Sequence, residues 1–459
     1  MYPVLAEKRM LYLTPEGGTV FIGNLPLQRV NPTGASILEL CNGKNTTDEI
    51  CAALAEKYDD DIARVTRIVD QFLEKSKRIV DQFLEKSKER GNIFLTEEPS
   101  EHPLICGNRE LWVPYYVSVE LTKKCDLHCI HCYAEAGPPP VDELPTERWL
   151  KVLNELYHLG TLTVNITGGD PLAHPDIFDV LDFCEEKFHV IVSTSGYRID
   201  KDTARKLSEY KSIETIQVSL DGPDPETHNS IRGRSDSFQK AVTALQLLSG
   251  LEPEVHVAMV VLPVNEDKIE ETITLAKRLG ANVFGAGRIY SVGRAKGKFP
   301  LSVEKMVALD KKVTELSQKY SDKTFIVRRR DPNVLQHTIG EDISLEDMLK
   351  YGDALMKAVG GNCGAGYRSV FIQSDGNVIP CGMLDNVIGN VAKTSVRDVL
   401  KSPVIQAFKG LAAPHADICG ECSTRFLCSG CHALAYMYSE KNPHCKWRRY
   451  YEERVPCAE

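Results

Sequence analysis

Glu120-Leu-Thr-Lys-Lys-Cys-Asp-Leu-His-Cys-Ile-His-Cys-Tyr133 is the stretch of sequence that decides the fold. It ends a strand-like apolar run and places Cys125, Cys129 and Cys132 in a C-x3-C-x2-C spacing. Three thiolates this close in sequence fit one [4Fe–4S] cluster, and they leave one iron free to bind another molecule. Zinc is the alternative, but a structural zinc site prefers four protein ligands, commonly in paired C-x2-C knuckles. The spacing therefore favours an iron–sulfur centre with an open iron.

The composition restricts the class of protein. The 459 residues are 42% hydrophobic and 26% charged, which is typical of a soluble globular chain of several domains. The net charge of -9 argues against a general nucleic-acid binder. No apolar run is long enough to span a bilayer, and the first residues lack the apolar core of a secretory signal. We therefore expect a cytoplasmic protein with neither nucleic acid nor membrane as a partner.

The 15 cysteines are clustered rather than evenly spread. In a large chain from a reducing compartment, clustered cysteines indicate metal binding rather than disulfides. Besides the first triad, seven cysteines lie between Cys363 and Cys445. The isolated cysteines are expected to be ordinary buried thiols. They are Cys41, Cys51, Cys106, Cys184 and Cys457.

Residues 1–95 are predicted to form a first module. Residues 19–22 have the pattern of a short strand between glycine-containing turns. Asn31-Pro-Thr-Gly and Thr46-Thr-Asp-Glu49 are helix starts, the second with a capping-box pattern. Two short helices and a strand ribbon suit a winged-helix-like domain. A DNA-binding winged helix is the alternative, and the acidic balance of the chain disfavours it.

A segment of this module is duplicated, because residues 67–77 are repeated identically as residues 78–88. The repeat length corresponds to about three helical turns, so the duplication would lengthen a helix by about 16 Å and keep its apolar stripe on one side. Two copies are too few for a solenoid. We interpret the repeat as a recent tandem duplication without functional effect.

Strand-like and helix-like segments alternate through residues 113–335. Strands followed by helices imply a parallel sheet with the helices outside. Residues 96–112, which contain two prolines, are expected to be a linker. The cysteine triad directly follows the first strand, at the edge where barrels of this kind place their active sites. The expected strands are 113–121, 162–166, 190–193, 215–220, 254–261 and 283–289, and the expected helices include 147–159, 204–210, 238–248 and 268–279.

The cysteine segment closely resembles the radical S-adenosylmethionine (SAM) enzymes. The resemblance implies an α/β fold with a partial (β/α)6 TIM barrel and a cluster whose open iron is chelated by the amino and carboxylate groups of SAM. One electron from that cluster then cleaves SAM and releases a 5'-deoxyadenosyl radical. Cys125, Cys129 and Cys132 would hold this catalytic cluster.

The same resemblance implies a set of contacts with SAM. Thr167-Gly-Gly-Asp-Pro171 matches the family's Gly-Gly-Glu-Pro run, with an aspartate in place of the usual glutamate, and its glycines let the backbone approach closely. A guanidinium suits the SAM carboxylate, a strand-end serine the ribose or amino-acid portion, and an aromatic ring the adenine. A plain core aromatic is the alternative for Tyr133. The predicted SAM-binding residues are Tyr133, Gly168, Gly169, Asp170, Ser219 and Arg232.

Residues 336–459 resemble the SPASM domain, a seven-cysteine extension that binds two auxiliary [4Fe–4S] clusters. Its C-x12-G-x4-C spacing runs from Cys363 to Cys381, but the gap before Cys431 is Ser-Gly instead of the usual three residues. The resemblance implies that these three cysteines hold a proximal cluster with an open iron, which could bind a substrate thiolate. A pair of zinc knuckles is the alternative. The implied ligands of the distal cluster are Cys419, Cys422, Cys428 and Cys445.

The first module carries the pattern NxTGxxILxLCNGKxTxxEI from Asn31 to Ile50. This pattern resembles the small chaperone-like domain of pyrroloquinoline-quinone biosynthesis, which recurs as a precursor-peptide recognition domain in peptide maturases. The resemblance implies that a leader peptide adds as a strand to the edge of the sheet.

Together these features look like a peptide maturase of the subtilosin-maturase kind. Such an enzyme installs a cysteine thioether crosslink in a ribosomally made precursor peptide and takes electrons from a donor such as flavodoxin or ferredoxin. Anaerobic sulfatase maturases, by contrast, carry an acidic residue where this chain has Gly382. Carbon–carbon crosslinking, oxidative decarboxylation and tetrapyrrole side-chain modification in haem synthesis are alternative reactions. A non-catalytic iron–sulfur sensor is a further alternative.

Overall fold

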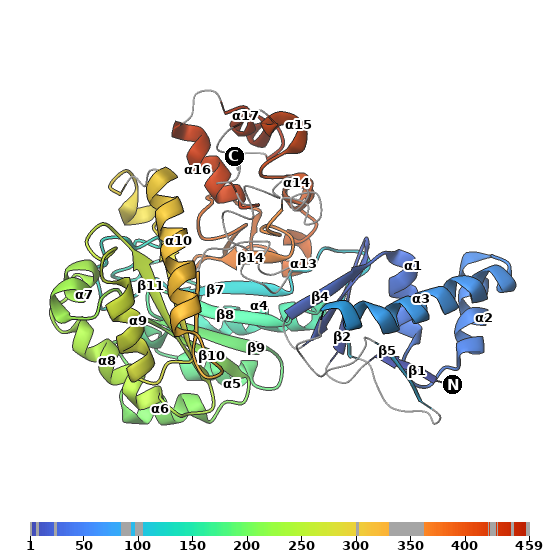
Figure 1. Cartoon of the computed structure of the whole chain (residues 1–459), viewed down its shortest axis with the longest axis horizontal. Helices are drawn as coiled ribbons and strands as arrows, with labels where there is room; N and C mark the ends of the chain where they lie inside the picture. The colour runs from blue at the N-terminus through green and yellow to red at the C-terminus, as the bar shows by residue number, and fades with distance from the viewer. Residues whose placement is uncertain are drawn as a thin grey trace. The chain divides into compact units, whose positions relative to one another are not determined.

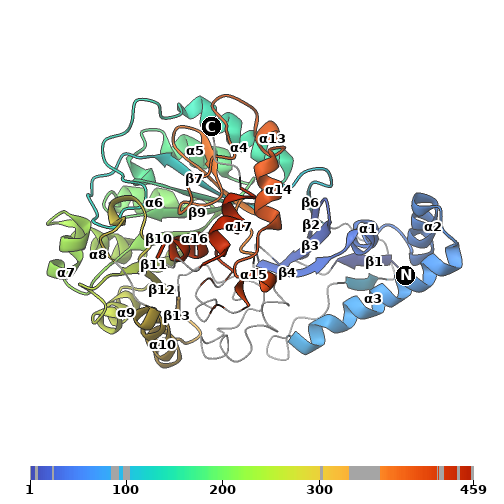
Figure 2. The same ribbon diagram turned by 90° about the horizontal axis from the view of Figure 1, so that it is seen from above.

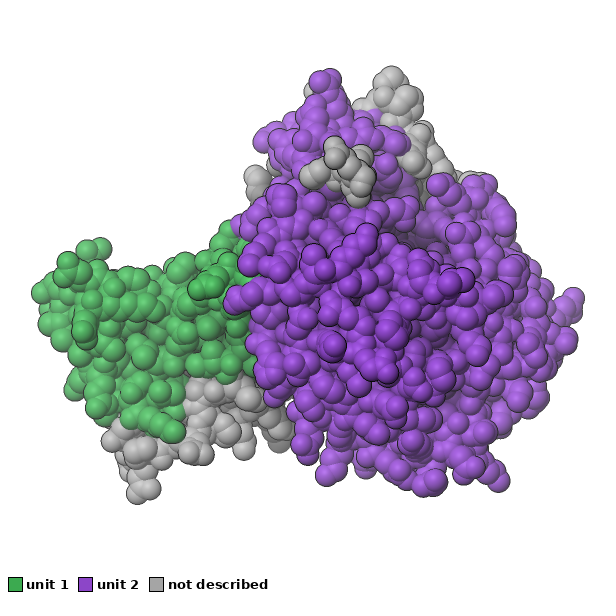
Figure 3. Space-filling view, turned by 180° about the vertical axis from the view of Figure 1, so that it is seen from behind, with its two compact units in different colours: residues 1–113 green, residues 114–459 purple. Residues whose placement is uncertain are grey.

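The chain forms two compact units, Met1–Val113 and Pro114–Glu459 (Figure 3). Every helix that can be described is too short or too polar to cross a membrane. The computed structural model describes residues 2–5, 9–22, 25–83, 93–96, 104–299, 303–329, 362–420, 422, 428, 430–441 and 445–455.

The first unit is built on a sheet of order β4-β3-β2-β6. β2 and β3 form an antiparallel hairpin, and β6 pairs with β2 in parallel. β6 lies within residues 96–112, where the sequence predicts a linker, and its Leu-Ile-Cys-Gly segment extends the sheet instead. The strand packs closely at its end, because a Cβ on Gly107 would lie 2.3 Å from the Leu13 carbonyl oxygen. The strands are β1 (Tyr2–Leu5), β2 (Arg9–Thr14), β3 (Gly17–Ile22), β4 (Leu25–Val30), β5 (Ile93–Thr96) and β6 (Leu104–Gly107), with β1 and β5 paired separately.

Three helices complete the first unit: α1 (Pro32–Leu40), α2 (Thr47–Tyr58) and α3 (Ile62–Phe83). Both predicted helix starts are confirmed. The Asn31 side chain accepts a hydrogen bond from the Gly34 amide, and Thr46 with Glu49 forms a reciprocal capping box. Each such cap typically stabilises a helix by about 1 kcal/mol, so the sequence fixes where these helices begin.

Helix α3 runs through the first copy of the duplicated segment and on to Phe83 in the second. Val65, Val69 and Leu73 are spaced four residues apart, and all three are buried in the core of the unit. This spacing places them on one face of the helix. Val69 and Leu73 belong to the first copy of the repeat, so the continuation of the stripe through the second copy stays a prediction. Residues 84–88, the end of the second copy, lie outside the described residues.

The second unit is built on a sheet of order β13-β12-β11-β10-β9-β8-β7-β14-β15-β16, parallel from β13 through β14. The predicted strand–helix alternation and parallel sheet are confirmed, and β13 adds a further parallel strand. The strands are β7 (Tyr116–Thr122), β8 (Thr163–Gly168), β9 (His189–Thr194), β10 (Ile213–Ser219), β11 (Glu254–Val261), β12 (Val283–Arg288) and β13 (Ile326–Arg329). The helices are α4 (Thr146–Leu159), α5 (Ile177–Cys184), α6 (Lys201–Ser208), α7 (Pro225–Arg232), α8 (Ser237–Leu248), α9 (Ile269–Arg278) and α10 (Val303–Tyr320).

The strands of this unit form a curved row, with helices α5, α6, α8 and α9 on its outer side (Figure 2). This arrangement is the partial barrel that the sequence predicts, and it leaves the carboxyl ends of the parallel strands at one edge. Short 3-10 helices, η1 (Pro171–Ala173) and η2 (Gly293–Ala295), follow β8 and β12 at that edge.

The C-terminal region joins the barrel through its sheet. β14 pairs in parallel with β7, with Ser369 opposite Tyr116, and the Ser374 amide donates to the buried Glu120 carboxylate at 3.2 Å. Helices α14, α15, α16 and α17 lie above β14 in Figure 1. Shared strand pairing therefore holds this region against the edge that carries the cysteine loop. Its elements are β14 (Ser369–Ile372), β15 (Asn377–Ile379), β16 (Gly389–Asn390), α13 (Val396–Val399), α14 (Pro403–Gly410), α15 (Ala416–Cys419), α16 (His432–Lys441) and α17 (Trp447–Glu452).

Candidate active site at the strand ends

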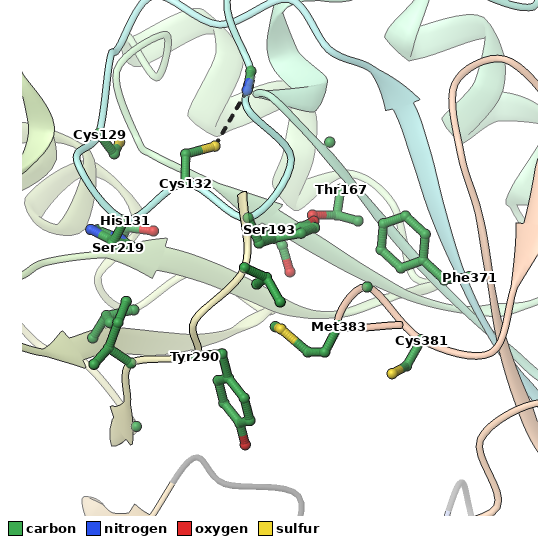
Figure 4. Close-up of a pocket in the computed structure, with 18 of the residues that line it drawn as sticks. Cys129, His131, Cys132, Thr167, Ser193, Ser219, Tyr290, Phe371, Cys381 and Met383 are labelled. Carbon is green, nitrogen blue, oxygen red and sulfur yellow. Dashed lines mark hydrogen bonds between the residues drawn. The ribbon is translucent and has the colours of Figure 1, made fainter. Parts of the chain in front are cut away.

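A cavity of about 470 Å³ opens at the carboxyl ends of the barrel strands (Figure 4). Its walls come both from the barrel and from the C-terminal region. Cysteines of both predicted groups line it, and no cysteine of the predicted distal set does so among the described residues. The cavity-lining cysteines are Cys125, Cys129, Cys132, Cys363, Cys381 and Cys431.

The loop that carries the first triad is closed by backbone hydrogen bonds. The Cys125 amide donates to the Gly137 carbonyl at 3.0 Å, and the Gly137 amide donates to the Lys123 carbonyl at 2.9 Å. Arg294 also pins the loop, because its guanidinium donates to the carbonyls of Cys129 and Ala136, both at 2.8 Å. The loop therefore has a fixed shape that depends on a side chain from η2, which follows β12.

Each sulfur of the first triad accepts an N–H hydrogen bond. The donors are the Leu127 amide to Cys125 at 3.5 Å, Arg232 Nη1 to Cys129 at 3.6 Å, and the Ala136 amide to Cys132 at 3.4 Å, drawn as a dashed line in Figure 4. Burial raises the pKa of Cys125 to about 12, so its thiolate needs the positive charge of a metal centre to form. Buried or partly buried sulfurs that each have an N–H donor fit the negatively charged ligands of an iron–sulfur cluster.

A single-ion site is a separate question. Among the described residues, no group of three or more His, Cys, Asp or Glu side chains is arranged to hold one metal ion. A cubane spreads its ligand sulfurs over separate irons, and so makes a different geometric demand.

The two glycines after β8 pack directly against the cysteine loop. The Gly169 amide donates to the Thr122 carbonyl at 2.7 Å, and a Cβ on Gly169 would lie 2.4 Å from the Lys124 carbonyl oxygen. Gly168 has a φ of +137°, which disfavours any side chain. Both glycines line the cavity. The close backbone approach predicted from the sequence is therefore an approach to the loop that carries the cysteines.

Asp170 follows these glycines, and the contact with SAM that the resemblance implies for this run stays a prediction. It does not line the cavity; its carboxylate is buried and accepts hydrogen bonds from the Thr194 hydroxyl at 2.9 Å, the Ser195 amide at 3.1 Å and the Leu172 amide at 3.1 Å. Burial raises the pKa of Asp170 despite these bonds. The shorter side chain thus turns inward and ties the loop after β8 to the loop after β9.

Arg232 does line the cavity, but it already has a charged partner. Its Nε lies 2.7 Å from Oδ2 of Asp221, whose side chain is fully buried, and that oxygen also lies 3.9 Å from His131 Nε2. Burial opposes ionisation of Asp221, but the neighbouring guanidinium holds the pKa of Asp221 below its usual value. Arg232 therefore links a buried carboxylate to the Cys129 sulfur. Its pairing with the SAM carboxylate stays a prediction.

The other predicted contact residues face the cavity. Ser219 lies at the end of β10, and the Tyr133 ring packs edge-on against Phe371 of β14, with centroids 6.0 Å apart. A Cβ on Gly382 would lie 3.2 Å from Tyr133 Cε2. Tyr133 therefore stands where the barrel meets the C-terminal region, and its role beside the adenine stays a prediction.

Sequence reasoning missed a polar row across the sheet. Ser193 Oγ donates to Asn165 Oδ1 at 2.9 Å, and Gln217 Nε2 donates to Ser193 Oγ at 3.4 Å. These residues line the cavity from three neighbouring strands, together with Thr167. The available signal was a polar side chain within each of these three strands. Such a row offers several hydrogen-bonding groups to a polar cofactor.

The C-terminal cysteines fall into two neighbourhoods. Burial raises the pKa of Cys431, and nearby Cys363 and Cys381 raise it further. Burial also raises the pKa of Cys363, but the adjacent His432 outweighs this effect and brings it to about 7. In the second neighbourhood Cys428 lies near Cys419, Cys422 and Cys445. This is the division that the resemblance implies, although ligation itself stays a prediction.

The isolated cysteines lie outside these neighbourhoods. Cys41, Cys51 and Cys184 are buried and Cys106 is partly buried, while Cys457 lies outside the described residues.

Comparison with protein families identifies the central part of the chain. Residues 119–276 match the radical SAM superfamily, residues 11–79 match the coenzyme PQQ synthesis protein D family, and residues 363–423 match an iron–sulfur cluster-binding domain of the SPASM type. This chain contains a radical SAM domain. The radical SAM and iron–sulfur domains imply SAM and [4Fe–4S] clusters as its cofactors.

Relatives of this chain match nearly its full length. The antilisterial bacteriocin subtilosin biosynthesis protein AlbA of Bacillus subtilis is 27% identical over 98% of this chain and 96% of its own length. An AdoMet-dependent heme synthase of Methanosarcina barkeri is 27% identical over 73% of this chain and 97% of its own length. The structure of Streptococcus suis SuiB bound to precursor peptide SuiA has the same fold, with a TM-score of 0.65, 18% identity and coverage of 97% of this chain and 100% of that one.

Proposed function

We propose that this chain is a radical SAM enzyme that matures a ribosomally made precursor peptide by installing a cysteine thioether crosslink. The proposal is based on one cavity that is lined by cysteines of two sets. The barrel loop contributes Cys125, Cys129 and Cys132, and the C-terminal region contributes Cys363, Cys381 and Cys431. Similarity to the subtilosin biosynthesis protein over nearly the whole chain supports a peptide substrate, as does the PqqD-like domain.

The proposal assigns a role to each wall of the cavity. Cys125, Cys129 and Cys132 hold the cluster at the barrel edge, and the polar row of β8, β9 and β10 holds SAM beside it. Bound SAM supplies, after one-electron reduction, the abstraction of a hydrogen atom from a substrate carbon. The cavity confines this chemistry and keeps water from the substrate carbon.

The opposite wall receives the substrate sulfur. Cys363, Cys381 and Cys431 would hold an auxiliary cluster, which would supply a position where a substrate thiol loses its proton and is oriented. The turn between Cys381 and Leu384 presents Gly382 and Met383 to the cavity, where the peptide would pass beside them. Formation of the carbon–sulfur bond removes two hydrogens from the peptide. The carbon loses a hydrogen atom and the thiol loses a proton. The remaining electron would pass to a cluster.

The remaining parts supply the partners. Cys419, Cys422, Cys428 and Cys445 hold a third, fully ligated cluster that passes electrons to or from a donor such as flavodoxin or ferredoxin. The sheet of the first unit ends in the edge strands β4 and β6, and one such edge takes the leader peptide as an added strand.

The test is anaerobic turnover of reconstituted enzyme with SAM, dithionite and any small cysteine-containing peptide encoded beside its gene. The expected product has lost a hydrogen pair for each crosslink, with sulfur-to-carbon fragments in tandem mass spectra. Cys125→Ser should abolish both SAM cleavage and crosslinking. Cys381→Ser should keep SAM cleavage and lose the crosslink. Unmodified peptide with active SAM cleavage by the unsubstituted enzyme would contradict the proposal.

Tetrapyrrole side-chain modification is a second candidate, supported by the match to the heme synthase over 97% of that protein. It predicts that a haem precursor, and not a peptide, accelerates formation of 5'-deoxyadenosine. The same turnover assay with each substrate class therefore separates the two reactions.

A further inference from the structure

His432 is held rigidly at the wall of the cavity. It is the first residue of α16, its side chain is fully buried, and it lines the cavity next to Cys431. Its ring stacks on Trp447, with centroids 6.4 Å apart and planes at 22°, and packs against Phe408 at 6.1 Å. Trp447 is fixed in turn by a 2.7 Å hydrogen bond from its indole to the Ala412 carbonyl. The imidazole therefore has one orientation.

That orientation aims one ring nitrogen at a cluster-facing sulfur. His432 Nδ1 lies 3.9 Å from Cys363 Sγ, within the range of a hydrogen bond to sulfur. The other nitrogen, Nε2, is buried and has no hydrogen-bond partner in the part of the chain that the structure describes. A buried polar ring with one nitrogen unsatisfied costs folding free energy, so the contact of the other nitrogen needs a functional reason.

The N–H donors to the sulfurs of Cys363, Cys381 and Cys431 indicate a functional reason for this contact. Cys381 accepts from the amides of Met383 and Leu384, and Cys431 accepts from the amide of Leu434. These are backbone donors. Cys363 accepts from the backbone amides of Ala365 and His432 and, in addition, has the His432 side chain as a donor. An N–H···S bond stabilises negative charge on the sulfur, and the reduced cluster carries more negative charge than the oxidised one.

We propose that His432 donates an N–H···S hydrogen bond to Cys363 and thereby raises the reduction potential of the auxiliary cluster at the cavity. The inference rests on the proposed function for its assignment of Cys363 as a ligand of that cluster. A raised potential makes this cluster a better acceptor for the electron released when the carbon–sulfur bond forms. His432 is thus a positioning and tuning residue, and it does not touch the substrate.

The test is a potentiometric titration of the full-length reconstituted enzyme, followed by electron paramagnetic resonance (EPR) of the reduced auxiliary cluster. His432→Leu removes the donor and keeps an apolar side chain, so it should shift the reduction equilibrium at least tenfold toward the oxidised cluster, about 59 mV for one electron. His432→Asn places an amide near the position of Nδ1, so its potential should lie close to that of the unsubstituted enzyme. Trp447→Phe changes the stacking and keeps the donor, so it should leave the potential in place.

A potential that is unchanged in His432→Leu at full iron content would overturn the inference. Loss of iron from His432→Leu would also overturn it, because the imidazole would then be a ligand. Unsubstituted protein whose histidines carry 15N in the imidazole ring alone gives a measurement that needs no variant and leaves out the His432 backbone amide. Pulsed EPR of its reduced auxiliary cluster should show a weak nitrogen coupling, whereas a strong coupling or none contradicts the hydrogen bond.

Failure of the underlying assignment is visible separately through Cys363→Ser. Unchanged iron content and auxiliary EPR signals in that variant would refute the ligand role of Cys363 and, with it, the proposed function. Loss of auxiliary iron in Cys363→Ser together with an unshifted potential in His432→Leu would refute only the role of His432.

Discussion

Removing one partner of the buried pair of Asp221 and Arg232 should strongly destabilise the second unit. Asp221 is fully buried, Arg232 is 7% exposed, and Nε of the arginine lies 2.7 Å from the carboxylate. The second carboxylate oxygen accepts a 2.9 Å hydrogen bond from the Val260 amide. Asp221→Asn keeps the size of the side chain and leaves a buried guanidinium without its counter-charge, which costs about 3–5 kcal/mol.

The assay is urea unfolding followed by tryptophan fluorescence, with the free energy difference taken from the shift in midpoint. The control is Glu209→Gln, which breaks an exposed pair with Arg205 at 2.7 Å and should leave the midpoint in place. A second variant, Asp221→Asn with Arg232→Met, removes both charges and should recover most of the loss. A midpoint for Asp221→Asn equal to that of Glu209→Gln would refute the reasoning.

Three further perturbations test other parts of the structure. Gly169→Ala would place a Cβ 2.4 Å from the Lys124 carbonyl oxygen, so it should displace the cysteine loop and lower the iron content of the first cluster; iron analysis checks this. Gly382→Asp places a carboxylate at the cavity wall and a Cβ 3.2 Å from the Tyr133 ring, so it should reduce peptide crosslinking at least tenfold by mass spectrometry. Burial raises the pKa of Glu120 from 4.5 to about 7, so its folded form retains the proton longer than its unfolded form. Stability should therefore fall as pH rises from about 4.5 to about 7, and Glu120→Gln should flatten that part of the urea-midpoint profile; equal slopes would contradict it.

Local patterns predicted local structure well. The capping box at Thr46 and Glu49 and the cap at Asn31 both form, because caps depend on residues three positions apart. The strand–helix alternation predicted a parallel sheet, since connections between parallel strands need a crossover helix. The triad spacing likewise placed all three sulfurs on one loop at the correct edge of the barrel.

Features that depend on distant residues could not be predicted. Strand β14 pairs with β7, and the Ser374 amide reaches Glu120 across 254 positions of sequence. Nothing in the sequence around Asp170 shows that its carboxylate turns inward to Thr194, because that partner is the last residue of the neighbouring strand β9. The contact of His432 with Cys363 spans 69 positions and exists only because α16 packs on the cavity. Each of these is a consequence of packing, not of spacing.

The central claim is that a substrate thiolate reaches the auxiliary cluster through the cavity shared by both triads. Its most direct test is EPR of a reconstituted Cys125→Ala variant, in which the signal of the first cluster is weakened, during titration with the cysteine-containing precursor peptide. The account predicts a change in the auxiliary-cluster spectrum that is absent with a peptide whose cysteines are replaced by serine. Identical spectra with both peptides, at concentrations where both bind the enzyme, would contradict it.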